Sequence, residues 1–337
     1  MIKDAISKLA DRIALSEKEA EEVMGEIMDG SATSAQIAGY LMGLRMKGET
    51  VEEIAGSVRA MRARAVKIRV AHRRVVDTCG TGGDRAHTFN ISTTAAFVVA
   101  GAGVAVAKHG NRSVSSQCGS ADVLAELGVK LDLPADRVAD CVDEVGIGFL
   151  FAPLYHSAMK HCAAPRQELG IRTLLNILGP LTNPAGAGFQ VIGVFDGALT
   201  ELLAKVLLHL GSQHCYIVHG LDGLDEVTLT DRTRISEGKA GVVSSYFIEP
   251  KDFGLGRVAP KDLRGGTPEQ NAVITRDILH GRKGPKRDVV CLNAAPALVS
   301  AGAAKTLQDG FVQAQRAIDC GAAMDKLDKL IAFTNRA

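Results

Sequence analysis

The stretch DTCGTGGDRAHTFNISTTA, residues 77–95, indicates an α/β fold for this chain of 337 residues. A short apolar run, Val75–Asp77, leads into three closely spaced glycines and an acid, and Ser92–Ala100 has the pattern of a helix. Glycines let backbone N–H groups approach an anion closely, and the start of the following helix adds unpaired N–H groups and a positive dipole end. The stretch therefore predicts a phosphate site between a strand and a helix.

The glycine loop, residues 80–90, matches neither common nucleotide pattern. Arg85 stands where both the Walker A pattern and the G-x-G-x-x-G fingerprint, counted from Gly80, require glycine. Side-chain donors at Asn90, Ser92 and Thr93 nevertheless surround the predicted helix start. The alternative is a tight turn that needs glycine only for its backbone angles. A phosphate-bearing ligand outside these two nucleotide classes is the favoured interpretation.

Strand and helix patterns alternate through much of the chain after this stretch. We expect helices at Ser120–Leu127, Pro134–Val145 and Glu201–Leu210. We expect further strands at Gly103–Ala107, Ile147–Phe151, Val191–Phe195, Tyr216–Val218 and Val289–Leu292. The alternation predicts an α/β fold with a mostly parallel central sheet that helices cover on both faces.

Residues 3–65 show helical patterns only. Two capping boxes begin at Ser16 and Thr50, Ser34 is a third N-cap candidate, and Gly48 is a C-cap candidate. About 40 residues between Phe151 and Val191 show no strand pattern, so we expect this segment to return to the N-terminal helices. The predicted architecture is a small all-helical domain and a large α/β domain with a cleft between them. The boundaries are 1–72, completed by a segment near 155–188, and 73–337.

A second polar loop, residues 108–122 (KHGNRSVSSQCGSAD), follows the predicted strand at 103–107. Open α/β sheets bind ligands at the carboxyl ends of their strands. Lys108, His109 and Arg112 supply positive charge there, and Asn111 and several serines supply donors, which suits a phosphate. A polar surface loop with a simple N-cap at Ser120 is the alternative. Two such loops after successive strands favour binding.

An acidic turn, residues 219–226 (HGLDGLDE), follows another predicted strand. Asp222, Asp225 and Glu226 offer the hard oxygen ligands of Mg²⁺, which commonly uses one or two carboxylates plus substrate phosphates. An acidic hairpin turn is the alternative, but two neighbouring phosphate loops favour the metal. Arg166, in the segment that leaves the sheet, can bind a carboxylate with two parallel bonds, although by itself it fits a surface arginine better.

Composition argues against several other classes of protein. The net charge of +1 gives no general argument for nucleic acid or a membrane, and the basic run at 59–74 is best interpreted as a solvated helix end with a linker. No apolar run approaches the roughly 20 residues of a membrane span. Seven cysteines without C-x-x-C spacing favour free thiols in the cytoplasm over a zinc site or disulfides.

Taken together, the motifs resemble the anthranilate phosphoribosyltransferase family of tryptophan biosynthesis. In chain order they are GTGGD with TFNIST, KHGNR-x-x-SS-x-x-GSAD, LGIRT-x-x-NILGPLTNP, HG-x-DGLDE and LNAAPAL. The resemblance implies a fold shared with pyrimidine nucleoside phosphorylases and a homodimer formed through the helical domain. It also implies a reaction in which 5-phosphoribosyl 1-pyrophosphate and anthranilate give N-(5-phosphoribosyl)anthranilate and pyrophosphate.

The resemblance also implies the site residues. Magnesium, expected as two ions per site, is assigned to Ser92, Asp225 and Glu226; anthranilate is assigned to Gly80, Asn111 and Arg166; and the catalytic residues are Lys108, Asn111 and Arg166. Phosphoribosyl pyrophosphate is assigned to Gly80, Gly83, Asp84, Thr88, Asn90, Ile91, Ser92, Thr93, Lys108, His109, Gly110, Asn111, Arg112, Ser113, Val114, Ser115, Ser116 and Ser120. The departures from the family pattern are Arg85 for glycine, the order Ala125–Glu126, and Leu175 for phenylalanine.

The implied chemistry needs no nucleophilic side chain, because the anthranilate amine attacks the ribose C1 and pyrophosphate leaves. Positioning and stabilisation of the leaving charge would supply the catalysis. Two alternatives remain open from the sequence: a pyrimidine nucleoside phosphorylase of the same fold, and a non-catalytic relative that binds nucleic acid through residues 59–74.

Overall fold

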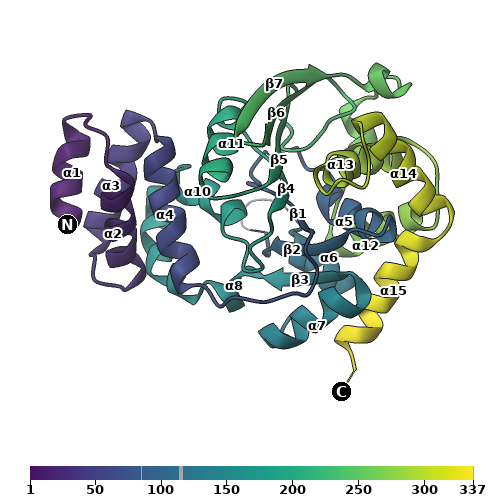
Figure 1. Ribbon diagram of the computed structural model, residues 1–337, viewed down its shortest axis with the longest axis horizontal. Helices are drawn as coiled ribbons and strands as arrows, with labels where there is room; N and C mark the ends of the chain where they lie inside the picture. Colours follow the sequence, from purple (N-terminus) through teal and green to yellow (C-terminus); the bar gives the residue numbers. More distant parts are fainter. Residues whose placement is uncertain (85, 114–116, 337) are drawn as a thin grey trace.

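The computed structural model describes residues 1–84, 86–113 and 117–336. Four helices form a group at the N-terminal end, and the rest of the chain surrounds a central sheet (Figure 1). The helices are α1 (Ile2–Ala10), α2 (Glu17–Met28), α3 (Ser34–Lys47), α4 (Val51–Arg64), α5 (Ile91–Gly101), α6 (Ser120–Glu126), α7 (Ala135–Val145), α8 (Ala152–Tyr155), α9 (Ala163–Leu169), α10 (Leu175–Leu178), α11 (Leu199–His209), α12 (Pro268–Leu279), α13 (Pro285–Ser300), α14 (Leu307–Asp319) and α15 (Ala322–Thr334). Short 3₁₀ turns are η1 (Ser157–Cys162), η2 (Gly179–Leu181), η3 (Pro250–Phe253) and η4 (Pro260–Leu263).

The described residues form one seven-stranded sheet in the order β3-β2-β1-β4-β5-β6-β7. Its first five strands are parallel, and β6 and β7 add an antiparallel hairpin at one edge. The strands are β1 (Val75–Gly80), β2 (Ala105–Gly110), β3 (Ile147–Phe151), β4 (Phe189–Gly193), β5 (His214–Gly220), β6 (Thr233–Lys239) and β7 (Val242–Ile248). This confirms the predicted α/β class with a mostly parallel sheet; the edge hairpin was not predicted.

One predicted strand is wrong: Val289–Leu292 lies inside helix α13. All four of its residues are buried, because α13 packs between the sheet and helices α5 and α14. A helix that is buried on every side has no polar face, so its apolar run cannot be distinguished from a buried strand by periodicity.

Two apolar cores cover the two faces of the sheet. Alternate residues along the parallel strands, such as Val76 and Val191, face the core built with α5 and α12–α15. Their neighbours, such as Ile192 and Ile217, face the core that includes α11 and the N-terminal helices. Burial on both faces explains why these strands have nearly continuous apolar sequences.

The N-terminal helices begin largely as the sequence predicts. The capping boxes at Ser16 and Thr50 are both formed. The third N-cap is Thr33 rather than the predicted Ser34, because the Thr33 side chain accepts from the Gln36 N–H and Gln36 completes a capping box. Gly48 ends α3 with a φ of 89°.

The segment between β3 and β4 leaves the sheet. It forms α8, η1, α9 and α10, of which η1 contacts α2, α9 contacts α3 and α10 contacts α4. Arg62 of α4 also donates from Nε to the Leu181 carbonyl oxygen at 2.9 Å. These contacts support our proposal that this segment completes the helical domain.

Most arginines of the basic run 59–74 have partners within the protein. Arg64 forms an ion pair with Asp29 at 2.7 Å, and Arg74 donates to the Ala301 carbonyl at 3.0 Å. Arg59 pairs with Glu17. These contacts weaken the case for nucleic acid at this run. A separate finding concerns membranes: none of the helices in the described part of the chain combines the length and apolar character of a span.

Candidate active site

The glycine loop, the second loop and the acidic turn meet at one edge of the sheet. They follow β1, β2 and β5 in turn, and these strands are parallel. In the strand order, β2 and β3 follow on one side of β1, whereas β4 and β5 follow on its other side. The strand order therefore reverses between β1 and β4, and ligands bind at such a switch point in open α/β sheets.

Two facing glycines allow the acidic turn to pack against this switch point. Gly80 of β1 pairs with Gly193 of β4. A Cβ atom on Gly193 would lie 1.6 Å from the Asp225 carbonyl oxygen, and one on Gly80 would lie 2.8 Å from its Oδ2. The Gly82 N–H donates to the same Oδ2 at 2.8 Å. The acidic turn and the glycine loop thus form one structure.

Glu226, the second acid of the pair, reaches the first turn of α5. Its Oε1 accepts the Ser92 N–H at 3.1 Å. The Asp225 carboxyl lies beside Asp84 and also beside Glu226. Burial raises the pKa of Asp225 to about 7 and that of Glu226 to about 8, and repulsion from the neighbouring carboxylates contributes to both shifts. Two acids held this way favour a cation between them.

These residues fit a magnesium ion. The two carboxylates and the Ser92 hydroxyl are hard oxygen donors, and a dication would offset the repulsion that raises both pKa values. Within the described ranges, no group of three His, Cys, Asp or Glu side chains is placed to hold a metal. A magnesium ion would therefore take its remaining ligands from water and substrate phosphates, as it commonly does.

We expect the unfolding free energy of the metal-free protein to fall as pH rises from about 4.5 to about 8, by up to about 1.4 kcal/mol per pH unit for each of the two acids. The raised pKa values mean that the folded state keeps protons that the unfolded chain has already released. Stabilisation by Mg²⁺ should grow over the same interval, because the ion replaces those protons. Thermal unfolding at several pH values, with and without Mg²⁺, measures both trends. A Mg²⁺ effect independent of pH would contradict this assignment.

Lys108 lies under both loops. Its side chain is only 3% exposed, and Nζ donates to the Thr78 carbonyl oxygen. Burial lowers its pKa, and the nearby charges of Asp77 and Glu226 oppose that effect. An ammonium group has three donors. The remaining two make no hydrogen bond with the described residues.

The side chain of Asn90 connects the start of α5 to the second loop and to α12. Its Nδ2 donates to the Cys118 carbonyl at 3.2 Å, and its Oδ1 accepts from Asn271 at 3.0 Å. Arg112 is engaged likewise, because it forms an ion pair with Asp122 at 3.0 Å. Both side chains therefore have partners within the protein where the sequence analysis expected phosphate ligands.

The other predicted residues are placed as follows. Asn111 is exposed, and its carbonyl accepts the Ser120 hydroxyl at 3.2 Å. A Cβ atom on Gly110 would lie 2.2 Å from the Ser120 Oγ. The Ser113 N–H donates to Asp122, and Thr88 forms an isolated β-bridge with Arg264. Gly83 has a φ of 79°. Ile91 and Thr93 are buried. Arg85, Val114, Ser115 and Ser116 lie outside the described residues.

A pair of buried histidines lies beside this site, and only His109 was among the predicted site residues. The rings of His109 and His156 are 5.1 Å apart, and among the described residues neither Nε2 has a partner. Burial lowers the pKa of His156, and it lowers that of His109 to about 3. Burial therefore favours the neutral form of both imidazoles. The signal was the position of His156 shortly after β3, whose end pairs with the end of β2.

Two arginines come from the segment that leaves the sheet. Arg166 lies half-buried on α9 and makes no hydrogen bond or ion pair with the described residues. Arg172 donates to the Gly83 carbonyl, and its guanidinium stacks 4.1 Å from the centre of the Phe195 ring. The structure thus brings Arg172 to the glycine loop, which the sequence analysis did not predict although LGIRT was among its motifs.

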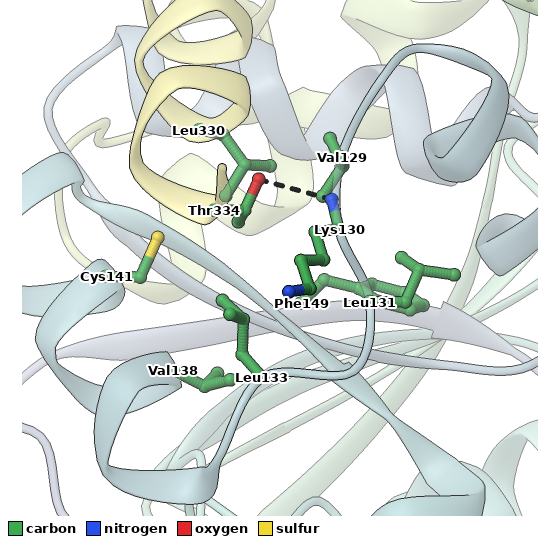
Figure 2. Close-up of a pocket in the computed structure, with 9 residues that line it drawn as sticks. All are labelled: Val129, Lys130, Leu131, Leu133, Val138, Cys141, Phe149, Leu330 and Thr334. Carbon is green, nitrogen blue, oxygen red and sulfur yellow. Dashed lines mark hydrogen bonds between the residues drawn. The ribbon is translucent and has the colours of Figure 1, made fainter. Parts of the chain in front are cut away.

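A small cavity elsewhere plays no part in this site. Figure 2 shows side chains of α7, α15 and the 129–133 connection around it, with the Lys130 N–H donating to the Thr334 hydroxyl at 3.2 Å. Its volume is about 10 Å³, room for about one water molecule. The lining is mostly apolar and lacks the charged groups gathered at the switch point.

Comparisons with known proteins agree with this geometry. The glycosyl transferase family a/b domain matches residues 72–324, and the helical bundle domain of that family matches residues 3–65. An anthranilate phosphoribosyltransferase of Moorella thermoacetica is 58% identical, over 99% of this chain and 98% of its own.

Solved structures show the same likeness. The anthranilate phosphoribosyltransferase of Thermus thermophilus has a TM-score of 0.94 and 43% identity, over 99% of this chain and 100% of its own. The enzyme of Saccharomyces cerevisiae, in complex with PRPP and Mg, has a TM-score of 0.89 and 26% identity, over 99% of this chain and 97% of its own. The chain belongs to the anthranilate phosphoribosyltransferase family.

Proposed function

We propose that the chain transfers the phosphoribosyl group of 5-phosphoribosyl 1-pyrophosphate to the amine of anthranilate in tryptophan biosynthesis. The products are N-(5-phosphoribosyl)anthranilate and pyrophosphate. The observation that carries this proposal is the packing of Asp225 against Gly80 and Gly82, beside Lys108 and the first turn of α5. Full-length similarity to anthranilate phosphoribosyltransferases supports the same reaction.

The pyrophosphate end of the substrate belongs at the switch point. Backbone N–H groups of the glycine loop and the two open donors of Lys108 would bind its oxygens. Ser92, Asp225 and Glu226 would hold magnesium, which offsets charge on pyrophosphate as it leaves. We propose two ions, as the family resemblance implies, one of them held between Asp225 and Glu226. Metal titration by calorimetry measures the number.

The anthranilate end belongs near the second loop and the segment that leaves the sheet. We assign anthranilate to Gly80, Asn111 and Arg166, with the Arg166 guanidinium on its carboxylate. The free Arg166 guanidinium supports this assignment, since it has no described partner to give up. The adjacent rings of His109 and His156 add two Nε2 atoms without a hydrogen-bond partner among the residues that the structure describes.

Replacing Arg166 with alanine should raise the apparent KM for anthranilate about 10-fold to 100-fold, because a charge-assisted bond to the carboxylate is lost. The KM for phosphoribosyl pyrophosphate should change much less. Steady-state kinetics with each substrate varied in turn measures the difference. A change confined to phosphoribosyl pyrophosphate would place Arg166 at the other end of the site.

The reaction itself is tested by fluorescence-monitored consumption of anthranilate, with and without phosphoribosyl pyrophosphate and Mg²⁺. Phosphorolysis of thymidine or uridine tests the nucleoside phosphorylase alternative, and salt-dependent DNA binding without turnover tests the nucleic-acid alternative. The full-length relatives named above favour the transferase, because they are anthranilate phosphoribosyltransferases.

We also propose a cytoplasmic homodimer. Exposed apolar side chains on the N-terminal helical region, Ile13 at 51% and Met46 at 70%, support an interface there. Free cysteines, most of them buried, are in keeping with a reducing compartment. Light scattering measures the mass in solution, and a monomer at all concentrations would contradict the dimer.

A further inference from the structure

The sheet splits between β1 and β2, close to the proposed site. Regular pairing of these two strands includes only Val75–Ala105 and Val76–Val106. On either side the ladders continue, from β1 to β4 as far as Gly80 and from β2 to β3 as far as Gly110. The two strands that carry the phosphate loops therefore separate just before those loops begin.

Side chains replace the missing rungs of the ladder. In a parallel sheet, the carbonyl of one residue and the N–H two residues later face the same neighbouring strand. On β2 these groups are the Ala107 carbonyl and the His109 N–H. Asn183 Nδ2 donates to the first at 2.8 Å, and Asp77 Oδ1 accepts from the second at 3.1 Å. Asp77 Oδ2 also accepts from Asn183 Nδ2, at 2.7 Å.

Stability alone does not explain a carboxylate at this place. Asp77 is fully buried, and the His109 N–H and the Asn183 amide that donate to its carboxylate carry no charge. Burial raises its pKa, and Lys108 is the strongest opposing charge. Conversely, Asp77 is the strongest of the charges that favour the Lys108 cation. Apolar residues with ordinary strand pairing would avoid the cost of burying this charge.

We propose that Asp77 is a positioning residue that acts on pyrophosphate through Lys108. Asp77 Oδ1 accepts the N–H of His109, the residue after Lys108, and Lys108 Nζ donates to the carbonyl of Thr78, the residue after Asp77. The two side chains therefore bridge the gap between the strand ends from opposite strands, and the charge of Asp77 favours the Lys108 ammonium that faces the leaving group. The carboxylate touches no substrate in this scheme. The inference rests on the proposed function, because it takes pyrophosphate as the ligand of Lys108.

A double-mutant cycle tests the coupling. Binding of inorganic pyrophosphate with Mg²⁺ is measured by calorimetry for the full chain, Asp77→Asn, Lys108→Met and the double variant. Asp77→Asn should weaken binding at least about tenfold in the Lys108 background, because a buried charge partner is lost. In the Lys108→Met background it should change binding by less than about twofold. Equal losses in both backgrounds, or no loss in either, would overturn the proposal.

Glu237→Gln is the matched control. Glu237 is a hydrogen-bonded carboxylate of the same sheet, on β6, with partners His214 and Tyr216 at 2.7 and 2.9 Å. Its loss should lower the melting temperature without weakening pyrophosphate binding. Equal weakening by Glu237→Gln would reduce the Asp77 effect to general destabilisation.

If Asp77→Asn does not fold, Asn183→Ala gives the same cycle, since it removes the 2.7 Å bond that holds Asp77. It should weaken binding about threefold with Lys108 present and not without it. Wild-type protein that neither binds pyrophosphate nor consumes anthranilate would refute the proposed function, whereas turnover combined with additive losses would refute only the role of Asp77.

Discussion

Replacing both acids of the pair, as Asp225→Asn with Glu226→Gln, should lower Mg²⁺-dependent turnover at least about 10³-fold, because the leaving charge loses its electrostatic support. The same variant should be more stable than the wild-type protein at about pH 8 without metal. Burial and mutual repulsion raise both pKa values, so ionising the pair in the folded state is unfavourable. A neutral amide pair of the same shape removes that cost.

Turnover at saturating substrate, metal titration and thermal unfolding measure these effects. Asp231→Asn with Glu249→Gln is the matched control, since it also removes two negative charges, both of them near Arg257. That control should keep turnover and Mg²⁺ affinity. Magnesium-dependent turnover that survives in the Asp225–Glu226 variant would show that these carboxylates do not hold the metal.

The sequence could predict the parts of the fold that depend on local chemistry. Capping boxes at Ser16 and Thr50 and a turn glycine at Gly48 mark helix ends through contacts within a few residues. The alternation of strand and helix predicted the parallel sheet. A helix that is almost fully buried, such as α13, cannot be predicted in this way. Its residues are apolar on all faces because of tertiary packing, so its sequence lacks the helical period of apolar residues.

The candidate site was predictable in its loops and less so in its side chains. Residues after successive parallel strands must meet at one edge, so the association of Lys108 with Asp225 and Glu226 follows from topology. The topology does not predict which of these side chains lack a hydrogen-bond partner within the protein. Asn90 and Arg112 have donors of the right kind, yet the Cys118 carbonyl and the Asp122 carboxylate accept from them. Arg172 and His156 reach the site only through the path of the segment between β3 and β4.

Gly193 is the residue whose importance sequence reasoning missed most completely, and Gly193→Ala should lower turnover at least about 100-fold although it removes no ligand. The added Cβ would lie 1.6 Å from the carbonyl oxygen of Asp225. The Cβ atom is attached directly to the backbone and the carbonyl oxygen is part of it, so rotation of a side chain cannot separate the two atoms. The acidic turn must therefore shift. The 2.8 Å bond between Gly82 and Asp225 would be lost with it. Overpacking also costs about 1–3 kcal/mol of stability.

The Mg²⁺ dependence of turnover separates displacement of the acid from simple destabilisation. If Gly193→Ala moves Asp225, the Mg²⁺ concentration for half-maximal turnover should rise, and saturating metal should restore part of the activity. Gly80→Ala should raise that concentration with a smaller loss of stability, because its Cβ would meet a carboxylate oxygen at 2.8 Å, which can rotate. Gly256→Ala is the matched control, since nothing among the described residues lies within 4 Å of its added Cβ. An unchanged Mg²⁺ requirement in Gly193→Ala would mean that the glycine pair serves strand packing and not the acid.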